Sequence, residues 1–338
     1  MAHNPAAAPL APERTGVLIV NLGTPDAPSY LGVQRYLREF LSDRRVITTS
    51  RLLWLPLLYG VILPLRPLKT TRKYRSIWMA EGSPLAVYSR RLADKLGALL
   101  KAREGEGVCV ELAMTYGNPG IARAIERLAA QGIRRLLVLP LYPQYCSATT
   151  QSVFDRVAAA LNRRRWSHPV RRITDYYQDA GYIEAWAGRI AAAWQGRGER
   201  SHLMLAYHGI PAKYVTEGDP YQQQTLATTR LIAERLKLQP DEYSHCYQSR
   251  FGRVEWLQPY ATDVLAALPQ RGIRKLTLVS PSFAVDCLET LEELGMDYRQ
   301  RYLSQGGERF DLLPCLNDGD EHAELLAGLI RQNLAGWA

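Results

Sequence analysis

The chain has 338 residues, of which 47% are hydrophobic and 22% are charged, and this composition excludes a disordered or fibrous protein. The length favours two domains, or two halves of one architecture, because a single hydrophobic core rarely grows this large. The formal net charge of +9 favours anionic partners. No nucleic-acid-binding motif accompanies the basic residues, so a small anionic ligand or a membrane surface is favoured over nucleic acid.

The predicted elements alternate along the chain between short apolar runs and segments with helical hydrophobic spacing. The predicted strands are residues 17–23, 109–116, 136–142, 202–209, 243–249, 276–283 and 310–316. Residues 121–132 and 225–236 are two of the segments with helical spacing. Strands that alternate with helices form parallel sheets with helices on both faces, so the chain is predicted to be an α/β protein.

A short internal repeat indicates two similar α/β lobes, each with its own sheet. Residues 131–136 (QGIRRL) are echoed by residues 271–276 (RGIRKL), and each segment ends a helix at a glycine before an apolar strand. We therefore predict an N-terminal lobe at residues 14–166 and a C-terminal lobe at residues 167–318. A final helix within residues 319–338 is predicted to pack back on the lobes.

Three features bear on the cellular location. The five cysteines are odd in number and far apart, so neither a disulfide framework nor a close-spaced metal motif is present, and a reducing cytoplasm is favoured. Residues 1–15 lack the pattern of a secretion signal, and we expect them to form a tail. The apolar run 52–65 is shorter than the roughly 20 residues that span a bilayer. Because it also contains Pro56 and Pro64, we expect it not to cross a membrane as a simple helix.

The strongest candidate for chemistry is His208, which ends an apolar predicted strand and is followed by Gly209 and Pro211. Ligands of open parallel sheets bind beyond the carboxyl ends of the strands. The common dinucleotide, P-loop, nucleophile-elbow and zinc-hydrolase motifs are missing from the sequence. An imidazole at this position can accept a proton or bind a divalent metal. The alternative is a histidine that merely caps the strand by bonding to the backbone.

An acidic row follows in a predicted helix near the end of the second lobe. Glu289, Glu293 and Asp297 are spaced four residues apart and lie on one face of a helix. The alternative is a solvated outer face. A single histidine and one carboxylate form a weak, open metal site, which suits the transfer of a metal rather than its storage.

Several short sequence strings, which follow one another along the chain, resemble those of the ferrochelatases, and most closely those of their short bacterial type. They are NLGTPDAP (21–28), FLSDRRV (40–46), GSPL (82–85), LPLYPQY (139–145), YHGIP (207–211), GDPY (218–221), YQSRFG (247–252) and DCLETLEE (286–293). The resemblance runs from about residue 16 to the C-terminal helix. It implies a chelatase-like fold of two Rossmann-like lobes with a porphyrin cleft between them.

The resemblance also implies roles for particular residues. His208 and Glu289 would be catalytic and face the metal, and Glu293 and Asp297 would relay protons or metal. Residues implied to lie near the macrocycle are Leu22, Tyr74, Ser83, Tyr116 and Trp256. The apolar run 52–65 corresponds to the lip of the cleft, and the basic residues from Arg66 to Arg75 could meet propionates or anionic lipid.

The implied activity is that of a lyase that inserts Fe(II) into protoporphyrin IX to give protohaem, with release of two protons, as the final step of haem biosynthesis. The alternatives are a chelatase for another tetrapyrrole, such as coproporphyrin III, and a non-catalytic haem- or metal-binding protein. We expect porphyrin and ferrous iron as small-molecule partners, no permanently bound cofactor, no iron–sulfur cluster and no nucleic acid. A monomer is favoured, in the cytoplasm, with peripheral membrane contact as an option.

Overall fold

The computed structural model describes residues 14–250, 252 and 254–337. The tail expected at the N-terminus therefore falls almost wholly outside the described residues. The strands are β1 (Thr15–Gly23), β2 (Val108–Tyr116), β3 (Arg135–Pro140), β4 (Val170–Arg172), β5 (His202–His208), β6 (Tyr243–Gln248), β7 (Lys275–Val279) and β8 (Arg309–Leu312). They form two parallel sheets with the orders β2-β1-β3-β4 and β6-β5-β7-β8. Because the order is the same in both sheets, the predicted pair of similar Rossmann-like lobes is confirmed.

The edge strand β4 extends the first sheet beyond the predicted lobe boundary at residues 166 and 167. Its residues pair with β3 from Leu136↔Val170 to Val138↔Arg172. The backbone N–H of Ile173 then donates to the carbonyl of Val138 at 2.9 Å. The predicted boundary is therefore too early. The sequence did not indicate this strand, because it is three residues long and two of them are arginines.

Each sheet has one face covered by helices of its own lobe. The helices of these two outer layers are α5 (Ile121–Ala130) and α6 (Ser152–Arg163) on the first sheet, and α10 (Ala261–Gln270), the π-helix η4 (Glu289–Tyr298) and α11 (Arg299–Ser304) on the second. Other elements are α8 (Ala212–Thr216), η2 (Gly105–Gly107) and η3 (Ser147–Gln151).

The other faces of the two sheets share one hydrophobic core. Ile19 and Leu139 of the first sheet and Leu205 and Val279 of the second belong to the same buried cluster. The helices that complete this core are α4 (Pro84–Glu104), α7 (Ala180–Arg197), α9 (Tyr221–Leu236) and α12 (Asp320–Leu334). The two lobes are therefore joined through a continuous apolar interior rather than through a flexible linker.

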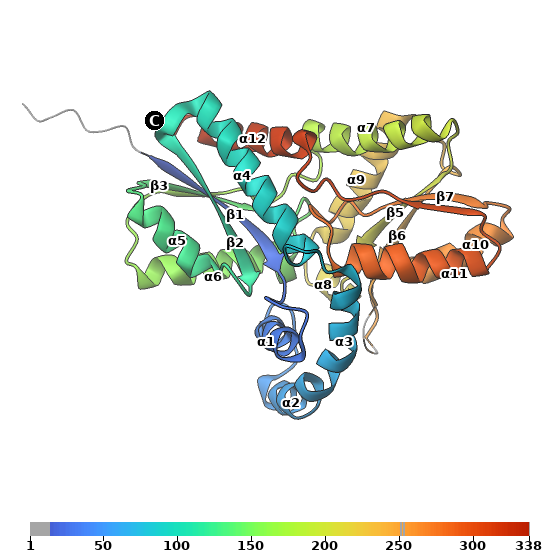
Figure 1. The fold of residues 1–338 in the computed structure, drawn as a ribbon, viewed down its shortest axis with the longest axis horizontal. Coiled ribbons are helices and arrows are strands. Elements are labelled where there is room, and N and C mark those ends of the chain that lie inside the picture. Colours follow the sequence, from blue (N-terminus) through green and yellow to red (C-terminus); the bar gives the residue numbers. More distant parts are fainter. Residues whose placement is uncertain (1–13, 251, 253, 338) are drawn as a thin grey trace, which may run out of the picture.

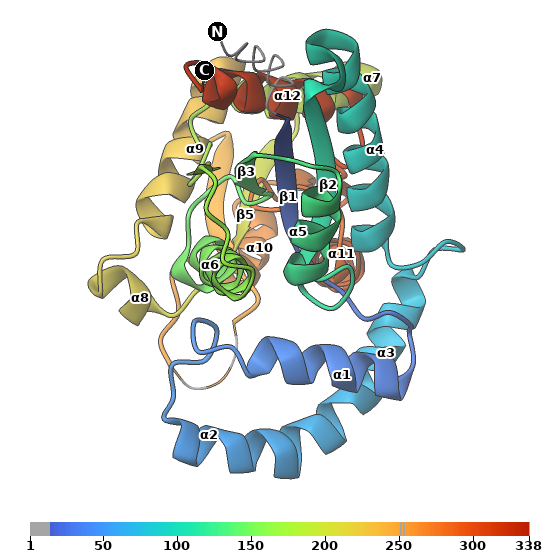
Figure 2. The same ribbon diagram turned by 90° about the vertical axis from the view of Figure 1, so that its left-hand side faces the viewer.

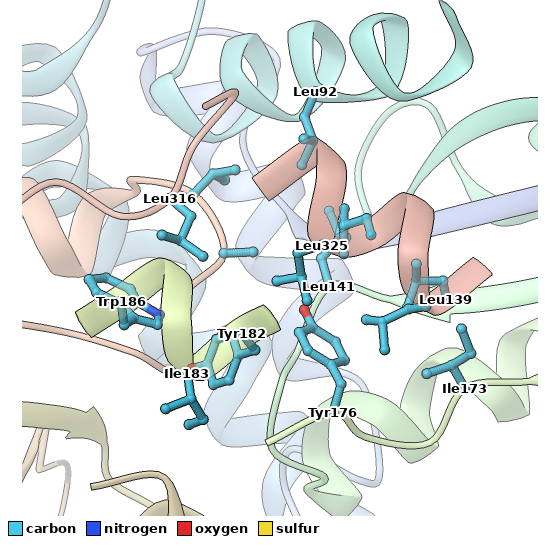
Figure 3. Close-up of a cluster of buried hydrophobic side chains, with 14 of the residues drawn as sticks. Leu92, Leu139, Leu141, Ile173, Tyr176, Tyr182, Ile183, Trp186, Leu316 and Leu325 are labelled. Carbon is cyan, nitrogen blue, oxygen red and sulfur yellow. The ribbon is translucent and has the colours of Figure 1, made fainter. Parts of the chain in front are cut away.

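The centre of the shared core contains large side chains from several helices (Figure 3). Trp186 of α7 is 0% exposed, and it lies in one cluster with Leu92 of α4 and Leu325 of α12. Truncation of a buried tryptophan typically costs about 3–5 kcal/mol. The C-terminal helix α12 packs on both α4 and α7, so it fixes the two lobes relative to each other.

A helical extension lies at the end of the molecule opposite α7 and α12 (Figure 1, Figure 2). It consists of α1 (Tyr30–Leu41), α2 (Arg51–Leu57), the π-helical turn η1 (Leu58–Ile62) and α3 (Leu63–Ile77). The last three form one continuous helix, Arg51–Ile77, which we call the lip helix. The π-helical turn directly precedes Pro64, whose ring would clash with the carbonyl four residues back in a regular α-helix. This turn explains why Pro64 does not end the helix.

By length and composition alone, the lip helix could cross a membrane. It has 27 residues, with a mean hydropathy of 1.3 in its apolar window, and it is the one such helix among the residues described. This differs from the expectation for residues 52–65, because the helix continues beyond the apolar run. Only 22% of the window is buried. Exposed apolar side chains on this helix are Leu52, Leu53, Leu57, Tyr59, Val61, Leu65 and Leu68.

Candidate active site

His208 is the last residue of β5, and its backbone is held on both sides. The N–H of His208 donates to Oγ of Ser282 at 3.3 Å, and the hydroxyl of Tyr221 donates to the carbonyl of His208 at 2.9 Å. Ser282 follows β7, and Tyr221 begins α9. Neighbouring strand ends and a helix start therefore fix the position of the half-buried imidazole.

The tautomer of His208 follows from a single hydrogen bond. Nδ1 lies 2.7 Å from the carbonyl oxygen of Gly209, and because a carbonyl can only accept, Nδ1 must carry the hydrogen. In the neutral ring Nε2 then holds the free lone pair. The imidazole of His208 therefore does bond to the backbone, as in the alternative predicted from the sequence, but only through Nδ1. It leaves Nε2 available to accept a proton or bind a metal.

Gly209 is held in turn by the adjacent strand. Its N–H donates to the carbonyl of Gln248 at 2.8 Å. A Cβ at this position would lie 2.8 Å from that carbonyl oxygen and 3.2 Å from the indole ring of Trp256. The structure therefore requires glycine here and places Trp256, a predicted substrate-binding residue, directly beside the histidine turn.

The acidic row lies on a π-helix rather than on the expected α-helix. Such helices are rare and frequently occur at functional sites. Glu293 accepts hydrogen bonds from the N–H of Ser249 at 3.0 Å, from its Oγ at 2.5 Å and from the hydroxyl of Tyr298 at 3.2 Å. Burial raises the pKa of Glu293, against the hydrogen bond from Ser249 and the charge of His208, which lower it. Glu293 therefore does not belong to a solvated outer face.

Glu289, at the start of the π-helix, faces the helical extension of the first lobe. Burial raises the pKa of Tyr74 well above its usual value, and the charge of Glu289 raises it further. The same charge raises the pKa of Tyr36, where burial is again the larger cause. Burial lowers the pKa of Arg66, and Glu289 opposes this shift. The carboxylate thus lies close to α1 and the lip helix.

The remaining acids of the π-helix form ion pairs. Asp297 forms an ion pair with Arg301 at 2.9 Å in which both side chains are exposed. Glu292 pairs with Lys73 of the lip helix at 2.6 Å. The row therefore runs from Glu289 at the contact between the lobes to Asp297 at the surface. Across the described ranges, no group of three or more His, Cys, Asp or Glu residues could hold a metal ion.

The predicted macrocycle-binding residues occupy different kinds of position. Leu22 and Tyr74 share an apolar cluster with Leu288 and Leu291 of the second lobe, beside Glu289. Tyr116 belongs to the same cluster but is 0% exposed.

Polar contacts account for the burial of Tyr116 and Ser83. The hydroxyl of Tyr116 donates to Asp43 at 2.9 Å and lies 3.1 Å from Ser152. Ser83 is 2% exposed and caps α4 by accepting from the N–H of Ala86. These residues thus have clear structural functions.

The sequence predicted no specific function for several residues that build the site. Tyr36, Gln248, Ser249 and Tyr298 each support or approach His208, Glu289 or Glu293. Gln248 and Ser249 lie in the string YQSRFG, which was the available signal. Their partners are distant in sequence, so the string alone did not indicate a function.

Comparison with solved structures places the fold among the chelatases. The structure of SirB from Bacillus subtilis with Fe3+ has a TM-score of 0.59 at 13% identity, and it covers 96% of this chain and 97% of that chain. The sirohydrochlorin chelatase SirB from B. subtilis subspecies spizizenii, in complex with cobalt, has a TM-score of 0.56 at 11% identity, with 94% of each chain covered. At these identities the likeness defines the fold alone: a two-lobed, chelatase-like protein.

Sequence comparison identifies the family. The model of the Ferrochelatase family matches residues 14–334. The ferrochelatase of Marinobacter nauticus is 46% identical over 326 residues, which cover 96% of this chain and 88% of that protein. The ferrochelatase of Vibrio cholerae is 46% identical over 319 residues, or 94% of this chain and 98% of that protein. The chain belongs to the ferrochelatase family, and the predicted lyase of haem biosynthesis is confirmed.

We predict that Gly209→Ala lowers chelatase turnover on the order of 100-fold, because the new methyl group displaces the histidine turn from the Gln248 carbonyl. Steady-state rates of metalloporphyrin formation measure the effect. Gly188→Ala in α7 is the matched control, since nothing lies within 4 Å of its added Cβ. Equal rates for Gly209→Ala and the wild type would show that the turn tolerates displacement.

Proposed function

We propose that the protein inserts Fe(II) into protoporphyrin IX, with His208 as the acceptor of a pyrrole proton and Glu289 facing the metal. The observation that carries this assignment is the hydrogen bond from Nδ1 of His208 to Gly209. It directs the hydrogen to Nδ1 and leaves a basic Nε2 at the carboxyl end of β5. An imidazole with a free basic nitrogen matches a reaction that releases protons from a neutral ring.

The apolar surroundings suit a flat macrocycle. Leu22 and Tyr74 from the first lobe meet Leu288 and Leu291 from the second, so a porphyrin bound there would contact both lobes. Binding energy from these faces can bend the ring toward the geometry of the product, which lowers the barrier rather than merely tightening binding. The basic residues from Arg66 to Arg75 are suited to the anionic propionates.

The proposed reaction balances in protons and charge. Two pyrrole N–H bonds break, two nitrogens become anionic donors, and Fe(II) replaces the two protons. His208 accepts one proton at Nε2, and the carboxylate of Glu289 accepts the other. Glu289 and Glu293 offer carboxylate oxygens to the incoming cation and a route for protons outward, with Asp297 at the solvent end. Iron is a substrate in this scheme, and the proposal includes neither a permanently bound cofactor nor an iron–sulfur cluster.

The choice of porphyrin is tested by comparing turnover on protoporphyrin IX and coproporphyrin III with Fe(II) under anaerobic conditions. We expect the higher kcat/KM for protoporphyrin IX, because the lining supplied by Leu22, Tyr74, Leu288 and Leu291 is apolar and coproporphyrin carries additional carboxylates. A preference for coproporphyrin III would reverse the substrate assignment. Binding of both without metal insertion would indicate a non-catalytic haem protein.

We predict that His208→Ala lowers turnover at least about 100-fold, because general base catalysis typically contributes a factor of that size. The thermal transition should stay close to that of the wild type, since the His208 imidazole is only half-buried. Zinc-porphyrin formation, followed by absorption, provides a second assay that does not depend on iron oxidation. Formation at the wild-type rate in this variant would remove His208 from the mechanism.

We also propose that the protein is cytoplasmic and monomeric, and that it contacts a membrane through the lip helix. Leu52 and Leu53 are 87% and 72% exposed. The basic residues from Arg66 to Arg75 continue the same helix. An exposed apolar surface beside basic side chains favours peripheral binding to anionic lipid.

For the membrane contact, we predict that Leu52→Asp combined with Leu53→Asp lowers affinity for anionic vesicles at least about tenfold, because two leucines no longer enter the lipid. Co-sedimentation with vesicles of phosphatidylglycerol and phosphatidylcholine measures binding. Leu226→Asp is the control, since Leu226 is also exposed but lies on α9. Unchanged binding by the double variant would exclude this surface.

A further inference from the structure

Among the described residues, no hydrogen-bond partner reaches the buried side chain of Gln248. Gln248 is 1% exposed, and within the described part of the chain neither Nε2 nor Oε1 of its amide is bonded. An amide can donate two hydrogen bonds and accept two. Because burying such a group unpaired is costly, an isolated amide of this kind indicates a small polar ligand or a functional role.

The position of Gln248 links it to the active site. It is paired in register with His208 on the adjacent parallel strand, so both side chains project from the same face of the sheet. The residues two positions earlier, Ala206 and Cys246, pack on that face against Leu294 and other residues of the π-helix. The amide and the imidazole thus lie side by side toward the acidic row.

The next residue completes the connection to Glu293. Ser249 has a φ of 63°, a left-handed conformation that a non-glycine residue adopts only when its surroundings enforce it. In this conformation its N–H and Oγ both donate to Glu293. The end of β6 therefore presents an unpaired amide directly before the two groups that hold the carboxylate.

The difference in burial decides which ligand can reach the amide. His208 is half-buried and can meet a macrocycle, whereas Gln248 is 1% exposed and cannot lie against a large ring. A water molecule is small enough, and buried waters typically make about three hydrogen bonds to otherwise unpaired polar groups. His208, Gln248 and Glu293 together offer these bonds.

We propose that Gln248 is a positioning residue that holds a water molecule between His208 and Glu293, through which the pyrrole proton leaves the imidazole. The proposal rests on the function proposed above. After His208 has accepted the pyrrole proton at Nε2, that N–H bond breaks as the water oxygen takes the proton. The same water releases another of its hydrogens to the carboxylate of Glu293. The remaining hydrogen of the water donates to Oε1 of Gln248, which orients the transfer.

This step leaves the site ready for another cycle. The imidazole returns to its neutral form, the water is regenerated, and Glu293 becomes a carboxylic acid that can pass its proton outward toward Asp297. No oxidant, reductant or further reactant is consumed. Gln248 itself neither gains nor loses a proton, so its function is purely to orient the water.

The decisive variant is Gln248→Met, which keeps the length of the side chain but cannot hold water. We expect turnover to fall about tenfold or more, as is typical when a supporting hydrogen-bond partner of a metal site is removed. We expect KM for the porphyrin to be unchanged and the solvent deuterium isotope effect on turnover to increase. The melting temperature should stay close to that of the wild type, because the variant removes the buried amide together with the water that it binds.

Gln144→Met is the matched control. Gln144 is also a buried glutamine, and its Oε1 likewise has no partner among the described residues, but its Nε2 donates to Thr228 at 3.0 Å and to Tyr182 at 3.4 Å. This variant should lose thermal stability and retain the turnover and isotope effect of the wild type. Gln248→Met is thus expected to change turnover but not thermal stability, and Gln144→Met to change thermal stability but not turnover.

The outcomes separate this inference from the function on which it rests. If Gln248→Met has the turnover and isotope effect of the wild type, the proposed role of Gln248 is overturned, while the proposed chelatase function still holds. A lower melting temperature with an unchanged isotope effect would make the amide structural and would also overturn it. If the wild-type protein itself inserts no metal, the proposed function fails, independently of Gln248.

Discussion

The whole site depends on one hydrogen bond, from Nδ1 of His208 to the carbonyl of Gly209. That bond decides which ring nitrogen is basic, and its acceptor residue is itself held in place by the hydrogen bond from the N–H of Gly209 to the carbonyl of Gln248. The geometry of an adjacent strand therefore sets the chemistry of a side chain. A parallel sheet supplies this control naturally, because neighbouring strands end at the same edge.

The two ends of the molecule have different functions. At one end α4, α7 and α12 close a single apolar core shared by both sheets (Figure 1, Figure 3). At the other end the lip helix and the π-helix meet around Glu289. Because the shared core fixes the lobes relative to each other, the opposite end can contain costly features, such as a half-buried carboxylate at Glu293 and a strained Ser249, without loss of the fold.

The sequence predicted most of the fold because apolar runs mark buried parallel strands. It failed at β4, where Val170–Arg172 has no such run. His208 could be found from its place after a strand, and Glu289 and Glu293 from their spacing. The hydrogen bonds from Ser249 to Glu293 join residues 44 positions apart, and no local sequence pattern indicates such a contact. The π-helical winding of residues 289–298 likewise depends on packing that spacing alone does not reveal.

The ion pair between Lys73 and Glu292 ties the lip helix to the π-helix at 2.6 Å. Movement of the lip helix away from the π-helix would separate the two charges. The Lys73 side chain is 50% exposed and that of Glu292 is 17% exposed, so dissolved ions reach the pair from one side and weaken its attraction. The attraction that holds the lip helix to the π-helix at this point therefore weakens as ionic strength rises.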